Sequence, residues 1–169
     1  IALHPDGLLW VGYYSAGVKL IEPKNGRVLL HMHENADDLK LVENRITYLY
    51  QEGDSLLYIG VHHELLQVYN LKTGALTNFK APVEDYIKLD QRLGVLTSMA
   101  QHPNIDNVTW ISTGGGLIKW NRQKETFLLK KYKGNLKKVS VHNKFKNIVF
   151  SGDSAMYIAT WGAGIVYYN

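Results

Sequence analysis

The sequence predicts an all-β fold: a segment of a β-propeller with about four blades, each of four antiparallel strands. Two observations lead to this prediction. A motif recurs four times along the 169 residues, and each copy divides into short strand-like runs bounded by turn residues. No stretch of ten or more residues keeps the hydrophobic period of a helix. Four strands per repeat without helices is the composition of a propeller blade.

The repeated motif begins with Asp and a small or polar residue, which is typical of a turn. Four positions later comes an aromatic residue, here called the anchor aromatic, then an aliphatic residue and a small one. The anchor aromatics are Trp10, Tyr58, Trp110 and Tyr157, and the small residues are Gly12, Gly60, Ser112 and Ala159. Small side chains would let neighbouring sheets approach closely. A β-sandwich is the alternative fold, but sandwich strands do not repeat a motif every ~40–50 residues.

The second copy shows the expected strands most clearly. They are Ile46–Gln51, Leu56–Val61, Leu66–Leu71 and Leu76–Lys80, all rich in β-branched residues, Leu and aromatic residues. Hairpin turns are expected at Lys72-Thr73-Gly74 and Lys24-Asn25-Gly26, where Gly is free to adopt a positive φ. The one helix candidate is Ala36–Glu43, between the first two copies.

These repeats predict a single, partial propeller domain over residues 1–169, with approximate repeats at 1–33, 44–80, 93–132 and 146–169. An open stack would leave two terminal blade faces unburied. If each exposed roughly 300–500 Å² of apolar area, the loss would be on the order of 15–25 kcal/mol, more than the ~5–15 kcal/mol stability of a typical domain. The ring must therefore close at four blades or, as we favour, include further blades of a longer parent chain.

Composition narrows the possible functions. The net charge of +4 is too weak to indicate nucleic acid as a partner. The chain has no Cys, which excludes disulfides, thiolate metal sites and a Cys nucleophile. No apolar run reaches the length of a membrane span, so contact with a membrane is expected only through the parent chain.

The motif from Asp6 to Ile21, Asp-Gly-x-Leu-Trp-Val-Gly followed by a short loop, resembles the two-component regulator propeller repeat. Asp153 to Tyr168 is similar, and Asn44 to Leu49 looks like the first strand of that repeat, with Leu93–Met99 a looser version. The second copy departs from the family pattern with His62-His63-Glu64-Leu65 where aromatic residues and glycines are usual. The third copy is one residue shorter, at Gly114-Gly115-Gly116.

The resemblance implies the periplasmic sensor region of a hybrid two-component system, which signals through a histidine kinase elsewhere in the parent chain. Many members sense oligosaccharides. The predicted function is therefore a ligand-sensing, non-catalytic propeller that binds an oligosaccharide. The alternative is a structural, protein-interaction propeller that mediates receptor dimerisation and binds no small molecule. The expected partners are the remaining blades and signalling domains of the parent chain, and a second copy in a homodimer.

Candidate ligand contacts lie in the loops after the second strand of each repeat, where specificity usually resides. The position four residues after each anchor aromatic is occupied by Tyr14, His62, Gly114 and Trp161. Aromatic and imidazole side chains around one mouth would stack on sugar faces and bind hydroxyl groups. Connections on the same face add Arg45 and the pair Asp37-Asp38. The predicted site is Tyr13, Tyr14, Arg45, His62, His63 and Trp161; the alternative is that the loop aromatics pack on the next blade.

No metal, cofactor or catalytic residue is predicted. His62 and His63 would point to opposite faces of a strand, and His31-x-His33 offers two imidazoles on one face without a third ligand nearby. Motifs for a Ser nucleophile or a phosphate loop are missing from the sequence. The repeated Asp6, Asp54, Asp106 and Asp153 indicate turns, and nothing shows that Glu84, Asp85 and Asp90 face one another as paired acids.

One segment is strongly basic. Between Thr126 and Gly152 stand seven Lys and no acidic residue: Lys130, Lys131, Lys133, Lys137, Lys138, Lys144 and Lys146. A solvated strand edge, on which Lys blocks unwanted pairing, is the favoured interpretation. A site for an anionic glycan is the alternative.

Overall fold

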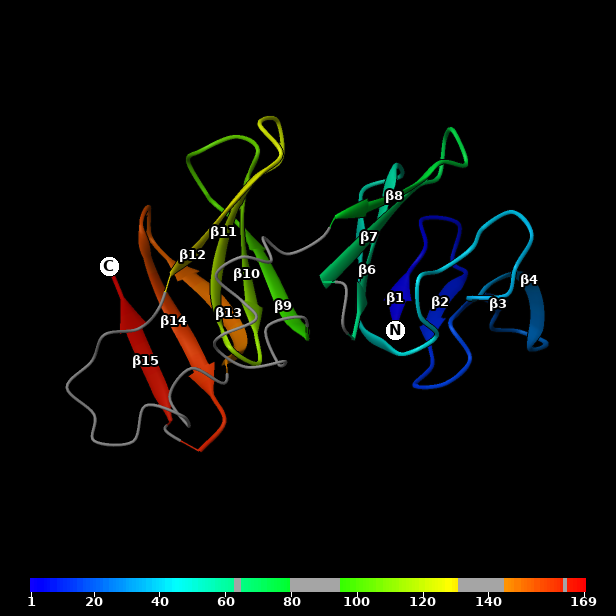
Figure 1. The fold of residues 1–169 in the computed structure, drawn as a ribbon, viewed down its shortest axis with the longest axis horizontal. Helices are drawn as coiled ribbons and strands as arrows, with labels where there is room; N and C mark the ends of the chain where they lie inside the picture. The colour runs from blue at the N-terminus through cyan, green and yellow to red at the C-terminus, as the bar shows by residue number, and fades with distance from the viewer. Residues whose placement is uncertain (63–64, 80–94, 131–144, 163) are drawn as a thin grey trace. The chain divides into compact units, whose positions relative to one another are not determined.

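The computed structural model describes residues 1–62, 65–79, 95–130, 145–162 and 164–169, and these form four antiparallel sheets (Figure 1). Blade 1 is β1 (Ala2–Leu3), β2 (Leu9–Gly12), β3 (Val18–Glu22) and β4 (Arg27–Met32). Blade 2 is β5 (Ile46–Glu52), β6 (Leu56–Val61), β7 (Leu65–Asn70) and β8 (Leu76–Phe79). Blade 3 is β9 (Leu96–Gln101), β10 (Val108–Thr113), β11 (Gly116–Asn121) and β12 (Thr126–Lys130). Blade 4 is β13 (Phe145–Ser151), β14 (Ala155–Thr160) and β15 (Ile165–Tyr168).

Within each blade, consecutive strands in the sequence are hydrogen-bonded neighbours in the sheet. In blade 2 the observed strands agree with the predicted ones to within one residue at each end. The described residues contain no helix, so the all-β prediction is confirmed there. In particular, they include no helix long and apolar enough to cross a membrane.

The predicted helix at Ala36–Glu43 is wrong, because this segment is an irregular loop with several bends. Its backbone groups bond to other parts of the chain: Leu41 N–H donates to the His33 carbonyl (3.1 Å), and Val42 N–H donates to Gln67 Oε1 (3.1 Å). The Leu41 side chain is fully buried in the core between blades 1 and 2. These long-range contacts replace the local hydrogen bonds that a helix needs.

The chain divides into two compact units, residues 1–80 and 81–169, and each holds a pair of blades with a core between them. The core of the first unit consists of Trp10, Val18, Met32, Leu41, Leu49, Leu57 and Ile59. The core of the second consists of Val108, Trp110, Leu117, Phe145, Ile148, Met156, Ile158 and Val166.

Both cores place an anchor aromatic against the third strand of the following blade. Trp10 meets Tyr69 edge-on, with ring centroids 6.1 Å apart, and Trp110 meets Tyr168 in the same way at 5.8 Å. The small residue of the motif also has the predicted role: a Cβ added to Gly12 would lie 2.6 Å from Ile46 Cγ2 of blade 2. The repeated motif is therefore a device for packing one blade on the next.

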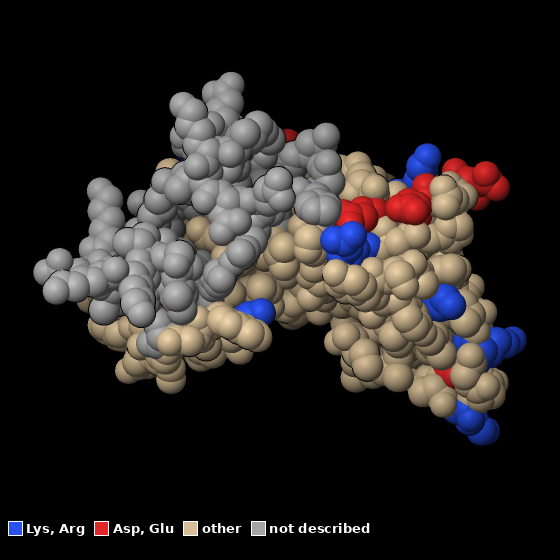
Figure 2. All heavy atoms as spheres, turned by 60° about the horizontal axis from the view of Figure 1, so that its bottom comes forward, with Lys and Arg blue, Asp and Glu red and all other residues tan. Residues whose placement is uncertain are grey.

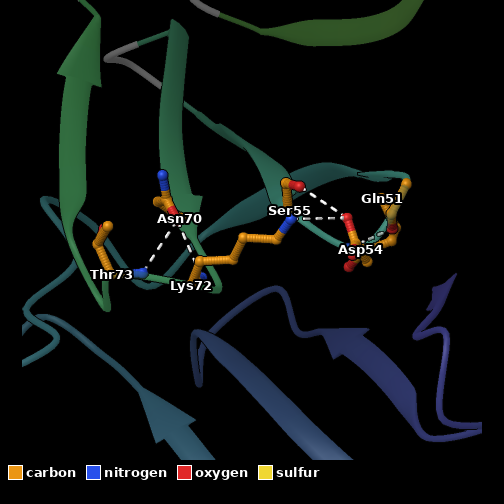
Figure 3. A network of polar contacts seen from close by, with 7 residues as sticks. Gln51, Asp54, Ser55, Asn70, Lys72 and Thr73 are labelled. Atoms are coloured by element: carbon orange, nitrogen blue, oxygen red, sulfur yellow. Dashed lines mark hydrogen bonds and ion pairs between the residues drawn. The ribbon is translucent and has the colours of Figure 1, made fainter.

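The four repeated Asp residues lie in turns, as predicted. Asp54, between β5 and β6, accepts a hydrogen bond from Ser55 Oγ (2.8 Å) and lies 3.3 Å from Lys72 Nζ (Figure 3). Ser55 first, and then Lys72, lower the pKa of Asp54. Lys72 lies in the β7–β8 turn, where Asn70 Oδ1 accepts from the N–H groups of Lys72 and Thr73. Side chains thus connect two exposed turns at one end of blade 2.

A second turn device, absent from the sequence predictions, involves His-Pro pairs. The Nδ1 atom of His4 accepts from Asp6 N–H, and that of His102 accepts from Asn104 N–H, both at 3.2 Å. The His102 ring also lies against Phe150, with centroids 5.3 Å apart. Burial, and then the charge of Lys119, lower the pKa of His102. The neutral ring is the form whose Nδ1 accepts a hydrogen bond.

We predict that His102 titrates at a lower pH in the folded chain than in the unfolded chain. Because its pKa is lower in the folded chain than in the unfolded chain, His102 contributes stability that is complete above the unfolded pKa of about 6.5 and is lost as pH falls below it. NMR titration of the seven His rings measures the midpoint. A His102 midpoint equal to that of the same residue in the unfolded chain would contradict the packing described.

We also predict that the anchor aromatics of blades 3 and 4 differ in their contribution to stability. Trp110 is 6% exposed beneath blade 4, whereas Tyr157 is 48% exposed on the outer face of blade 4. Trp110→Ala should cost about 3–5 kcal/mol of unfolding free energy, and Tyr157→Ala about 1 kcal/mol or less. Urea denaturation of the two variants compares them directly; equal losses would mean that the two faces are equally buried.

Candidate ligand-binding site

The loop Tyr13–Gly17, between β2 and β3, is bonded to the connection that leads into blade 2. Tyr13 N–H donates to the Gly17 carbonyl (2.8 Å), and Gly17 N–H donates to the Asn44 carbonyl (3.0 Å). In return, Ile46 N–H donates to the Tyr13 carbonyl (3.0 Å). The loop therefore belongs to the junction of blades 1 and 2, and its shape depends on both.

Gly17 closes this loop with φ at +71°. A Cβ at this position would lie 2.1 Å from the Met32 carbonyl oxygen, so no larger residue fits without movement of the backbone. His31 supports the same loop, since its Nε2 lies 2.7 Å from the Ala16 carbonyl oxygen. Its ring lies 4.6 Å from that of His33, so the predicted placement of the two imidazoles on one strand face is confirmed.

Three predicted site residues bring their side chains together at this junction, and the backbone of a fourth, Tyr13, is bonded to it. Tyr14 is 71% exposed, and the Arg45 guanidinium carbon lies 5.2 Å from the centre of its ring. Arg45 Nη1 is 3.2 Å from His62 Nδ1, and Arg45 Nε is 3.4 Å from Glu43 Oε1. We call the set Tyr14, Glu43, Arg45 and His62 the junction cluster.

The backbone holds the junction cluster in place. His62 N–H donates to the Arg45 carbonyl (3.1 Å), so the loop after β6 is fixed beside the chain that carries Arg45. Tyr13 is half-buried and its ring lies 5.1 Å from Lys19 Nζ. The cluster thus presents an exposed aromatic ring beside two nitrogen-bearing side chains and one carboxylate.

The second unit repeats the loop of blade 1 with other side chains. Thr160 N–H donates to the Gly164 carbonyl (2.9 Å), the equivalent of the Tyr13–Gly17 bond, and Gly164 also has a positive φ of +77°. Trp161 is 63% exposed, and Lys146 Nζ lies 4.6 Å from the centre of its ring. A cation beside an exposed aromatic therefore occurs in both units.

In blade 2 the loop ends on Leu65, which occupies the position of Gly17 and Gly164. The registers agree: Val61 pairs with Leu65, as Tyr13 faces Gly17. Leu65 has φ at +64° and is fully buried. Left-handed backbone is costly for a branched side chain, and such strain is found mostly where the surrounding packing enforces it. Burial of the Leu65 side chain offsets the free-energy cost of this strained backbone, which closes the loop that begins at His62.

A β-bulge recurs near the start of the first strand in blades 2, 3 and 4. The pairing skips Thr47, Thr97 and Lys146, one residue in each blade. Bulges re-aim side chains. Thr97 Oγ1 donates across to the Phe145 carbonyl of blade 4 (2.9 Å), whereas Lys146 reaches the Trp161 ring. The same irregularity thus provides an inter-blade bond in one blade and a cation for an exposed ring in another.

Sequence reasoning identified part of the site and missed part. It named Tyr14, Arg45 and His62, whose side chains the structure brings together. It also named Tyr13, whose ring lies beside Lys19, and Trp161, which belongs to the second unit. His63 lies outside the described residues, and Asp37 and Asp38 are exposed. It missed Glu43, His31 and Lys146, whose contacts depend on strand pairing and a bulge.

Charged groups of both signs are interspersed on the described part of the face in Figure 2. Most of the Lys-rich stretch, residues 131–144, lies outside the described residues. Lys146 is described, and its ammonium group lies over the Trp161 ring of the same unit in a cation–π contact. The choice between a strand edge and an anion site for this stretch stays a prediction.

Comparison with known proteins identifies the fold. No family model and no curated protein matches the chain. Among solved structures, the extracellular domain of BT4673, described as a hybrid two-component system of B. thetaiotaomicron, is 19% identical with a TM-score of 0.71. That match covers 99% of this chain and 20% of the other. The WD40 β-propeller domain of Doa1 is 8% identical with a TM-score of 0.64, over 95% of this chain and 45% of the other.

The four sheets are propeller blades. A third match, the extracellular domain of the hybrid two-component system BT3049 of B. thetaiotaomicron, is 18% identical with a TM-score of 0.59. It covers 98% of this chain and 26% of the other. The chain thus spans about a fifth to a quarter of the length of these two extracellular domains. At these identities the likeness establishes the propeller fold, and the two-component repeat family named above stays unconfirmed.

We predict that Gly17→Ala destabilises the chain more than Gly26→Ala. Both glycines have φ near +70°, but a Cβ at Gly26 meets nothing within 4 Å. Gly26→Ala therefore measures backbone strain alone, roughly 1–2 kcal/mol, and Gly17→Ala should cost about 2 kcal/mol more because the backbone at Met32 must move. Chemical denaturation measures both. Equal costs would show that the loop does not close against Met32.

Proposed function

We propose that this propeller segment is a ligand-sensing, non-catalytic part of an extracytoplasmic two-component receptor, located in the periplasm, and that it binds an oligosaccharide at the junction cluster. The supporting observation is the exposed Tyr14 ring beside Arg45 and His62. The fold supports the receptor context, since two solved structures of the same fold are extracellular domains of hybrid two-component systems.

The chemistry of the cluster suits a sugar. A tyrosine ring offers an apolar face to the C–H groups of a pyranose, and adjacent nitrogen donors and carboxylate acceptors suit its hydroxyl groups. Arg45 covers part of the Tyr14 ring, yet the side chain is still 71% exposed, so a large part of the ring is accessible.

The charge of the cluster favours a neutral sugar over an acidic one. Arg45 is the cation nearest to Tyr14, and Glu43 lies 3.4 Å from its Nε. A carboxylate on the ligand would have to compete with Glu43 for the guanidinium. Binding to a neutral oligosaccharide should accordingly change little with salt, because no net charge is neutralised.

Binding is tested by a thermal-shift screen of the chain against neutral and acidic oligosaccharides. A ligand at 100 times its dissociation constant stabilises the folded state by ~2.7 kcal/mol, which raises the midpoint by several degrees. We expect a shift with one class of neutral sugar, and we expect Tyr14→Ala to weaken binding about tenfold or more. Titration calorimetry of the same variants measures the affinity.

Two matched variants serve as controls. Tyr167→Ala removes another exposed tyrosine, 55% exposed on β15, and should leave the affinity unchanged. Trp161→Ala tests the second unit: loss of binding only in this variant would move the site away from the junction cluster. If no sugar shifts the midpoint, the sensing proposal fails for these blades and the scaffold function remains.

A further inference from the structure

The outer face of blade 4 exposes a row of large apolar side chains. Val149, Tyr157, Ile165 and Tyr167 are 58%, 48%, 73% and 55% exposed. They lie on one face of the sheet, because Val149 pairs with Tyr157, which in turn pairs with Tyr167. The opposite face, with Ile148, Met156, Ile158 and Val166, is buried against blade 3. Blade 4 is therefore apolar on both faces, which is unusual for a sheet face in contact with water.

The exposed row occupies the positions through which blades 1 and 3 contact the blade that follows them. In blade 3 these positions are Ala100, Trp110 and Leu117, and all three pack in the core shared with blade 4. The strand registers establish the equivalence: Ala100 pairs with Trp110 and Ser112 with Leu117, just as Val149 pairs with Tyr157 and Ala159 with Ile165.

Blade 1 uses the same three positions. Ala2, Trp10 and Val18 contribute to the core shared with blade 2, and the registers again agree: Ala2 pairs with Trp10, and Gly12 with Val18. Two rows of this kind, one in each unit, are thus covered by a following blade. The row on blade 4 has the same pattern, and its side chains are exposed.

The covering blades share their contact residues as well. Blade 2 presents aliphatic side chains from its first two strands and Tyr69 from its third; blade 4 presents a similar set with Tyr168 at the equivalent place. The equivalent residues are Ile46, Leu49, Leu57, Ile59 and Tyr69 in blade 2, and Phe145, Ile148, Met156, Ile158 and Tyr168 in blade 4.

We propose that the face formed by Val149, Tyr157, Ile165 and Tyr167 seats a further propeller blade. Its occupant is a sheet that presents aliphatic side chains on the first two strands and an aromatic residue on the third. The contact continues, at the same positions, an interface that the chain already forms once in each unit. This proposal is independent of the sugar site, whose residues lie in the first unit.

A blade with this face can be supplied from the chain itself. Asn169 stands at the position of Glu22, because Tyr168 pairs with Met156 as Ile21 pairs with Leu9. A second copy of residues 23–80 placed directly after Asn169 therefore continues the repeat in register. It adds a fourth strand to blade 4 and then a copy of blade 2, which carries the required contact residues.

The test compares the original and the extended chain, each with and without Tyr157→Lys. In the original chain we expect a monomer in which Tyr157→Lys shifts the thermal midpoint by less than about 2 °C, as for an exposed residue. In the extended chain the midpoint should rise by about 5 °C or more, and Tyr157→Lys should abolish most of that gain. Ile105→Lys, at another exposed apolar residue of the second unit, should have little effect in either chain.

Each other outcome overturns the proposal. An extended chain that gains no stability, or whose stability is insensitive to Tyr157→Lys, shows that the face does not seat a blade. A dimer of the original chain that Tyr157→Lys dissociates, seen by light scattering, assigns the face to a second copy. A monomeric original chain that is strongly destabilised by Tyr157→Lys shows that the face is already covered within the molecule.

Discussion

Packing of an anchor aromatic on the next blade is the interaction on which the rest of the structure depends. Trp10 and Trp110 are almost completely buried, and each meets a tyrosine on the third strand of the following blade. Burial of an aromatic side chain of this size is among the largest single contributions available to a core. The adjacent small residue permits the close approach, as Gly12 does against Ile46. Because every such contact requires two sheets, the stability of one blade depends on its neighbour.

The junction cluster follows from this packing. Once blades 1 and 2 are in contact, the Tyr13–Gly17 loop bonds to the backbone of Asn44 and Ile46, and Arg45 lies beside Tyr14. The last residue of the loop is constrained to a left-handed backbone: it is Gly17 in blade 1 and the strained Leu65 in blade 2. The loop position four residues after the anchor aromatic differs between the blades, with Tyr14 in blade 1 and His62 in blade 2. A rigid inter-blade frame with variable loop side chains is the arrangement expected of a recognition surface.

The sequence was sufficient to predict those features of the fold that belong to the repeated motif. Spacing of Trp10, Tyr58, Trp110 and Tyr157 predicted the strands of blade 2 and the role of the small residues, because each is a local pattern repeated four times. The segment Ala36–Glu43 has no counterpart in the repeat, and its irregular form depends on bonds to His33, just before it, and to Gln67, far along the chain. The contact of Arg45 with Glu43 was missed for a similar reason: orientation of a long side chain is set by tertiary contacts and not by spacing.

The two inter-blade cores also show how the repeat permits different chemistry at one position. Trp10 Nε1 donates to Gln51 Oε1 of blade 2 (2.9 Å). At the position of Gln51, blade 4 carries Phe150, so Trp110 Nε1 is buried without a partner among the described residues, at a cost of about 1–3 kcal/mol. An acceptor at this position therefore matters for a buried Trp anchor, whereas a Tyr anchor can be satisfied within its own blade, as the Tyr58 hydroxyl is by Glu52.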